Sequence, residues 1–131
     1  MKNKKLIISI LPEKFGICHF DKKTPIPEWA LEGNFSSITK TDQEISIVYP
    51  QGKIPGGVLF EENWIAFRLE SVVDGVYAVG IIASLSAPLA KTGISIFNIS
   101  TYETNYLLVE EKNLAKAKII LSKFCEIKNN K

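Results

Sequence analysis

The pattern of apolar residues in the second half of the chain constrains the fold more than any other feature of this sequence. A strand-like run at 64–72 is followed by a helical pattern at 78–91, where apolar residues recur every three or four positions. Strand patterns follow at 94–100 and 106–109, and a second helical pattern covers 111–124. This order supplies five of the six elements of a ferredoxin-like α+β unit, in which both helices cover one face of an antiparallel sheet.

The sixth strand has two candidate sources, the short tail at 125–128 and the N-terminal half. A sheet built jointly by both halves is the most economical arrangement. Prolines and glycines cluster at 49–63 and predict a boundary, which gives subdomains 1–58 and 59–131. Strand patterns in the N-terminal half lie at 6–11, 15–20, 35–39 and 44–49.

Composition and charge limit the partners. The 131 residues carry a net charge of +2, mainly from lysines near the two ends, and no basic face interleaved with aromatic residues predicts a nucleic-acid partner. The apolar run before Pro12 is too short for a signal peptide. Pro88, Lys91 and Gly93 interrupt the longest apolar run, so we expect no membrane partner and a cytoplasmic location.

Few residues suggest catalysis. His19 follows Cys18, but neighbouring side chains of a strand point to opposite faces, so they are poorly placed to act together. Cys18 and Cys125 are typical of buried, reduced thiols. Asp74 and Glu103 could form an acid/base pair, yet no neighbouring histidine, cysteine or lysine completes a catalytic set. We therefore expect no enzyme, no cofactor and no metal.

Two polar loops remain as candidates for binding. The loop at 72–80 enters the first predicted helix of the C-terminal half, where backbone N–H groups can hold an anion such as a carboxylate. The hairpin tip at 100–105 lacks the glycine of most tight hairpins and offers hydroxyl and carbonyl acceptors suited to an ammonium group. Together they would seat a free amino acid. Loops that simply face water are the other interpretation.

Three stretches carry a family resemblance: "WALEGNFSSITKTDQEISIVYP", "GIIASLSAPLAKTGISIFNISTYETNYLLV" and the helical pattern that follows. They resemble short bacterial ACT-domain proteins related to the ACT domains of the CASTOR arginine sensors. The resemblance covers about residues 6–124 and is most specific in "ISIFNISTYETNYLLV". It implies a β-α-β-β-α-β fold, a pair of ACT-like subdomains, and amino-acid binding at an interface between ACT units.

The resemblance also implies where a ligand lies. In the family the ligand sits between the loop entering the first helix and a tip of the form Ser-Thr-aromatic-x-Thr-Asp. Asn105 stands where relatives usually carry the aspartate. Amides around Val79 and Gly80 are expected to hold the ligand carboxylate, and Thr101 and Asn105 its ammonium. The expected ligand-binding residues are Asp74, Val79, Gly80, Ser100, Thr101, Tyr102, Glu103 and Asn105.

The sequence thus predicts a non-enzymatic regulatory protein that senses a small molecule, most simply an amino acid, and acts allosterically through an ACT–ACT interface. A homodimer and a regulated protein partner are the expected assemblies. The alternative is an interaction module without a ligand, in which the tip and the sheet edge pair with another chain.

Overall fold

The computed structural model of the chain describes residues 6–72 and 81–129. Three predicted ligand-binding residues, Asp74, Val79 and Gly80, lie outside the described residues. Within the described part of the chain, no helix is long and apolar enough to cross a membrane.

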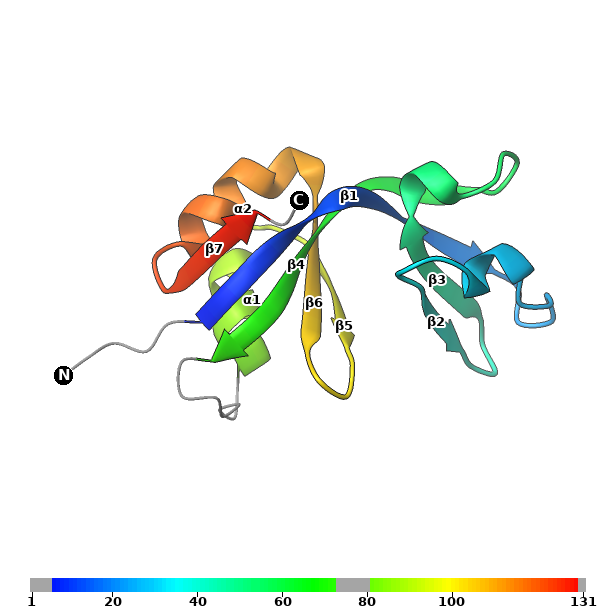
Figure 1. Cartoon of the computed structure of the whole chain (residues 1–131), viewed down its shortest axis with the longest axis horizontal. Coiled ribbons are helices and arrows are strands. Elements are labelled where there is room, and N and C mark those ends of the chain that lie inside the picture. The colour runs from blue at the N-terminus through cyan, green and yellow to red at the C-terminus, as the bar shows by residue number, and fades with distance from the viewer. Residues whose placement is uncertain (1–5, 73–80, 130–131) are drawn as a thin grey trace. The chain divides into compact units, whose positions relative to one another are not determined.

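The chain packs as two compact units. Unit 1 consists of residues 1–12 and 65–131, and unit 2 consists of residues 13–64. Two long strands, β1 (Leu6–Phe20) and β4 (Phe60–Val72), each contribute residues to both units (Figure 1). The predicted division into two ACT-like subdomains at residue 58 stays a prediction.

Unit 1 contains the ferredoxin-like order that the sequence predicts. From β4 onward the elements follow as strand, helix, strand, strand, helix, strand, and the sheet has the strand order β7-β1-β4-β6-β5 (Figure 1). The remaining elements of unit 1 are α1 (Ile81–Lys91), β5 (Ile96–Ser100), β6 (Asn105–Glu110), α2 (Leu114–Leu121) and β7 (Cys125–Asn129).

Alternation along the strands decides which face of this sheet the two helices cover. Phe67 and Leu69 of β4 pack into the same core as both helices, so Arg68 and Glu70 lie on the opposite face. We call that opposite face the helix-free face. The core of unit 1 consists of Ile8, Phe67, Leu69, Leu85, Leu89, Ile94, Leu107, Val109, Ala117, Leu121 and Cys125.

The tail and the N-terminal half, the two candidate sources of the sixth strand, both contribute to this sheet. The tail forms β7, and the first residues of β1 pair with it in parallel, with Leu6 opposite Cys125. The two strands predicted at 6–11 and 15–20 are one strand, so that prediction was wrong at Pro12. Pro12 lies between the stretch of β1 that pairs with β7 and the stretch that pairs with β3.

The first helix of unit 1 ends at its predicted limit, and the second is shorter than predicted. α1 contains Pro88 in its last turns and is followed by Gly93, which has a positive φ of 77° and ends the helix. The second predicted helix is shorter than expected, because 111–113 forms a separate 3₁₀ turn and α2 ends at Leu121. Asn113 occupies the N-cap position of α2, but its side chain forms no capping hydrogen bond there.

Unit 2 consists of a small sheet and two short 3₁₀ turns, Glu28–Leu31 and Gln51–Lys53. β3 (Ile45–Pro50) pairs antiparallel with the second part of β1 and with β2 (Ser37–Lys40). The 3₁₀ turn at Glu28–Leu31 follows Pro27, and Gly33 has a positive φ of 83° after it. The core of unit 2 consists of Cys18, Ala30, Ile45, Ile47 and Tyr49.

Replacing Leu89 by alanine tests the core of unit 1. Leu89 is fully buried between helix and sheet, so Leu89→Ala is expected to lower the free energy of unfolding by about 2–5 kcal/mol. Ile119→Ala is the matched control, because Ile119 lies in α2 with 65% of its surface exposed and should change stability by less than about 0.5 kcal/mol. Urea titration followed by circular dichroism measures both. Equal losses in the two variants would contradict the assigned core.

Candidate functional site

The tip between β5 and β6 is closed by side chains and not by glycine. The backbone N–H of Thr101 donates to the carbonyl of Thr104 at 2.8 Å, and the Thr101 hydroxyl donates to the same oxygen at 3.1 Å. The same hydroxyl accepts the backbone N–H of Thr104 at 3.0 Å. A threonine at the first position therefore supplies both a donor and an acceptor to the turn, which explains how the tip dispenses with an Asn-Gly pair.

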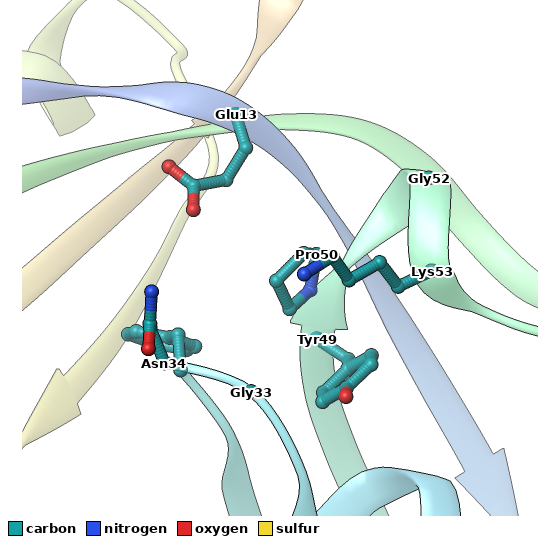
Figure 2. A pocket seen from close by; sticks show the side chains of 8 residues that line it. Glu13, Gly33, Asn34, Tyr49, Pro50, Gly52 and Lys53 are labelled. Atoms are coloured by element: carbon teal, nitrogen blue, oxygen red, sulfur yellow. The ribbon is translucent and has the colours of Figure 1, made fainter. Parts of the chain in front are cut away.

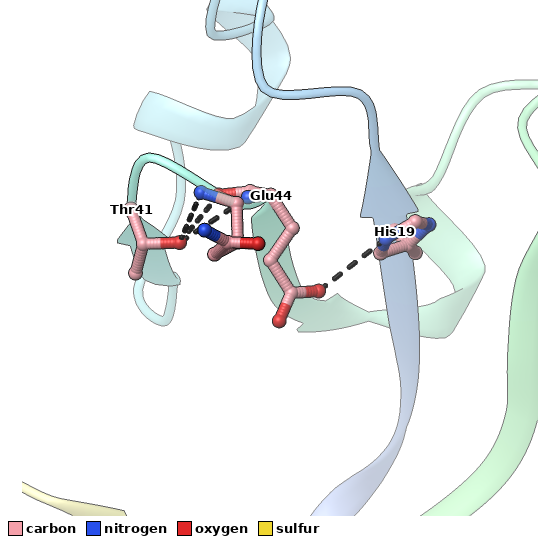
Figure 3. A network of polar contacts seen from close by, with 4 residues as sticks. His19, Thr41 and Glu44 are labelled. Carbon is pink, nitrogen blue, oxygen red and sulfur yellow. Dashed lines mark hydrogen bonds and ion pairs between the residues drawn. The ribbon is translucent and has the colours of Figure 1, made fainter.

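Unit 2 contains the same turn. The hairpin between β2 and β3 begins with Thr41, whose backbone N–H donates to the carbonyl of Glu44 at 2.9 Å. The Thr41 hydroxyl accepts the backbone N–H of Glu44 at 3.2 Å and that of Gln43 at 3.0 Å (Figure 3). The hairpins of the two units thus close in the same way, although their sequences, TDQE and TYET, share little beyond the first threonine.

A row of hydrogen-bonded polar side chains lies at the base of the tip. The side-chain amide of Asn98 donates to the Ser100 hydroxyl at 3.1 Å, and this hydroxyl donates to Oδ1 of Asn105 at 2.8 Å. Ser100 and Asn105 are direct partners in the β5–β6 ladder. The pair Ile96 and Val109, two steps along that ladder from Asn98, packs into the core, so the polar row lies on the face that the helices cover. Ser100 fixes the orientation of the Asn105 amide.

Thr104 anchors the tip to the neighbouring strand. Its hydroxyl donates a hydrogen bond to the carbonyl of Leu69 in β4. Leu69 lies three residues before β4 ends at Val72, immediately before the segment 73–80 that was predicted to form the other wall of the site. The tip is therefore fixed near the end of β4 by a side chain and not by the ladder alone.

The predicted site residues are only partly brought together in the described part of the chain. Ser100, Thr101 and Asn105 lie in one hydrogen-bonded cluster. Tyr102 is fully exposed at the tip, and Glu103 is exposed next to it. The remaining three, Asp74, Val79 and Gly80, lie outside the described residues, so the helix-start anion site stays a prediction and the acid/base pair of Asp74 with Glu103, which the sequence did not favour, is not tested.

Cys18 and His19 point to opposite faces of β1, as predicted. The Cys18 side chain is fully buried, whereas His19 is exposed and its Nε2 lies 3.3 Å from Oε1 of Glu44 (Figure 3). Burial raises the pKa of both thiols, that of Cys125 to about 11. Such thiols stay protonated near neutral pH and are poor nucleophiles. Both cysteines are free and buried, which matches the prediction of structural thiols.

Sequence reasoning missed a polar network on the helix-free face of unit 1. Nε of Arg68 donates to Oε2 of Glu70 at 2.6 Å, and side-chain hydrogen bonds link Glu70 to Ser9 and Arg68 to Tyr106. Burial alone would raise the pKa of Glu70, but the hydrogen bonds from Arg68 and Ser9 outweigh it and hold the pKa below its ordinary value. The alternation of Arg68 and Glu70 with Phe67 and Leu69 could have revealed this network.

Removing the Thr104 hydroxyl tests the anchor of the tip. Thr104→Val keeps the shape of the side chain but leaves the Leu69 carbonyl without this donor, which should lower the free energy of unfolding by about 1–2 kcal/mol. Thr39→Val, at an exposed position of β2, is the control and should change stability by less than about 0.5 kcal/mol. Urea unfolding measures both, and an unchanged midpoint for Thr104→Val would argue against the anchor.

The pH dependence of stability tests the Arg68–Glu70 pair. The folded-state pKa of Glu70 is lowered, so the pair stabilises the fold above the ordinary glutamate pKa and loses this contribution as the pH falls through the lower folded value. Glu70→Gln should cost about 1 kcal/mol at pH 7, a modest figure because both side chains are about one-third exposed.

The difference between wild type and Glu70→Gln should therefore shrink as urea titrations are repeated from neutral pH down into the acid range. Glu126→Gln, at an exposed position of β7, is the control and should show no comparable difference at neutral pH. A gap for Glu70→Gln that stays constant with pH would rule out the ion pair as its source.

Comparison with known proteins identifies the fold and the family. A family model described as an ACT domain matches residues 59–123, and a second model, described as the N-terminal domain of another family, matches residues 13–57. The chain belongs to the ACT-domain proteins. The second match falls within unit 2, and the first covers most of unit 1.

The ACT-domain protein has a curated relative among sensors. It is 28% identical over 90 residues to "Cytosolic arginine sensor for mTORC1 subunit 1" of Rattus norvegicus, covering 62% of this chain and 27% of the sensor. The chain thus spans about a quarter of the length of that curated relative. The likeness agrees with the resemblance to CASTOR-type sensors.

Solved structures extend this comparison. A crystal structure of an Agrobacterium tumefaciens protein has a TM-score of 0.87 and 33% identity, covering 97% of this chain and 95% of that one. Aspartate kinase of Clostridium acetobutylicum, described as an allosteric enzyme, has a TM-score of 0.67 and 16% identity over 88% of this chain and 33% of the kinase. The likeness to the kinase shows the fold alone. The family match and the likeness to the sensor support a regulatory ACT domain.

Proposed function

We propose that this ACT-domain protein is a non-enzymatic sensor that binds a free amino acid beside the β5–β6 tip and signals through an interface between ACT units. The observation that carries the proposal is the oriented Asn105 amide. Because Ser100 donates to Oδ1 of Asn105, the amide is held in one orientation before any ligand arrives. Preorganised polar groups lower the entropy that binding must overcome.

The chemistry of Asn105 limits the class of ligand that the proposed site can bind. Its Oδ1 accepts one hydrogen bond from Ser100 and keeps a second lone pair that can accept from an ammonium group. An aspartate at this position would add a full negative charge, and charge-assisted hydrogen bonds are about twice as strong as neutral ones. Arginine and lysine bring a second positive charge, which a carboxylate at this position would attract and the neutral amide does not. We therefore propose an amino acid with a neutral side chain in preference to a cationic one. The ligand carboxylate would be held by backbone N–H groups around Val79 and Gly80.

Signalling requires a difference in affinity between two states. A ligand that binds one arrangement of an ACT–ACT interface more tightly shifts the population toward that arrangement. By the same linkage, formation of that arrangement raises the affinity for the ligand by the same factor. We propose a homodimer as the assembly that carries this interface, with a regulated protein as the downstream partner. The family match and the likeness to an arginine sensor support this proposal.

Calorimetric titration of the full chain with each of the twenty amino acids tests the proposal. At least one neutral amino acid is expected to give heat and to raise the melting temperature, since a ligand bound only by the folded state stabilises it. Asn105→Ala should weaken this binding by about tenfold, the loss of roughly one hydrogen bond to a charged group. Asn113→Ala is the matched control, because the Asn113 side chain forms no capping bond.

Asn105→Asp sharpens the test. The added carboxylate should improve binding of arginine or lysine relative to the wild-type chain. Absence of heat and of thermal shift with all twenty amino acids would refute amino-acid sensing by this protein.

A ligand-independent interaction module is the second candidate function. Tyr102 favours it, because an aromatic side chain that is fully exposed at a fixed hairpin tip is suited to anchoring a partner. Size-exclusion chromatography with light scattering, with and without amino acids, separates the two candidates. A dimer that is indifferent to ligand and is lost in Tyr102→Ala would favour the interaction module.

A further inference from the structure

We propose that unit 2 contains a second small-molecule site, separate from the tip, that takes a small zwitterion with an apolar body. A pocket of about 180 Å³ opens in this unit (Figure 2). All of its walls come from unit 2, so it is complete within residues 13–64. Its lining residues are Glu13, Gly33, Asn34, Phe35, Tyr49, Pro50, Gly52 and Lys53.

The pocket has rigid apolar walls. The ring of Phe35 packs against the fully buried Phe15, with ring centroids 4.8 Å apart. Tyr49 is only 3% exposed, and its hydroxyl donates to the carbonyl of Glu32 at 2.9 Å, so the phenol is already satisfied. Tyr49 therefore offers its ring to the pocket, and Pro50 adds a further apolar surface (Figure 2).

Two opposite charges reach the pocket from different elements. Glu13 is half-buried in β1, and Lys53 ends the 3₁₀ turn that follows β3. Figure 2 shows the Glu13 carboxylate directed into the space and the Lys53 side chain running over Pro50 toward it. Within the described residues, neither charged group forms a hydrogen bond or an ion pair. Each is free to bind a ligand group of opposite sign.

Size and charge together define the ligand class. A cavity of about 150 Å³ is large enough for benzene, so this pocket fits a compact molecule of similar size. An ammonium group would bind Glu13, a carboxylate would bind Lys53, and an aliphatic body would rest on Phe35, Tyr49 and Pro50. The Asn34 amide can donate to the carboxylate or accept from the ammonium. An α-amino acid with a small aliphatic side chain, such as L-valine, has all three parts.

Titration of the ¹⁵N-labelled full chain with L-valine, isobutylamine and isobutyrate tests this site. L-valine is expected to shift the backbone amide signals of Gly33, Asn34 and Gly52, and each single-charge analogue to bind about tenfold more weakly because one charge-assisted contact is missing. Shifts confined to the tip amides of Thr101 and Thr104 would refute this second site while leaving binding at the tip intact.

Variants of Glu13 and Lys53 test which of the two side chains binds the ammonium of the ligand and which binds its carboxylate. Glu13→Gln should weaken L-valine binding at these amides by about tenfold and leave isobutyrate unaffected, whereas Lys53→Met should weaken L-valine and leave isobutylamine unaffected. Glu28→Gln and Lys40→Met remove exposed charges of unit 2 outside the pocket and should change neither titration.

Two further measurements show whether the two proposed sites are independent and whether the variants are folded. Asn105→Ala should leave L-valine binding at Gly33, Asn34 and Gly52 unchanged, because the proposed tip site is not involved. Thermal unfolding should show that the Glu13 and Lys53 variants remain folded. Folded variants that bind L-valine as tightly as the wild type, or isobutylamine binding as tightly as L-valine, would overturn the zwitterion assignment.

Discussion

The division of β1 between two ladders is the constraint on which both units depend. The first part of this strand pairs in parallel with β7 in unit 1, and the second part pairs antiparallel with β3 in unit 2. Pro12 lies between the two stretches. Ile8 and Cys18, one in each part, belong to the cores of unit 1 and unit 2. A single strand therefore supplies both a ladder and core side chains to each unit.

Hydrophobic periodicity was sufficient to predict five of the six ferredoxin-like elements of unit 1. The alternation of Phe67 and Leu69 with polar neighbours, and the helical spacing of Leu85 and Leu89, are local signals that survive in the structure. The order of elements from β4 to α2 followed from them, whereas the tail that forms β7 was one of two candidates for the sixth strand. The continuity of β1 through Pro12 did not, because the tolerance of a proline depends on which neighbours pair with it and not on the local sequence.

The candidate sites were harder to predict because they depend on side-chain geometry. The tip was recognised as unusual, but the way Thr101 closes it became visible only with the hydrogen bonds, as did the matching turn at Thr41. The pocket of unit 2 joins Glu13 to Lys53, which are far apart in the sequence and carry no motif. Such residues come close together only in the folded chain, so motifs defined by sequence spacing cannot identify them.

The interruption of unit 1 by unit 2 has a consequence for the order of folding. Unit 2 is a continuous stretch of chain, so its contacts can form as soon as that stretch has left the ribosome. The sheet of unit 1 is completed later, because the ladder in which Leu6 pairs with Cys125 can form only after β7 has been synthesised. Contacts between residues so distant in sequence slow folding. During synthesis the edge of β1 that will pair with β7 therefore stays uncovered until the last strand is made, and such an open edge is exposed to aggregation or to capture by a chaperone.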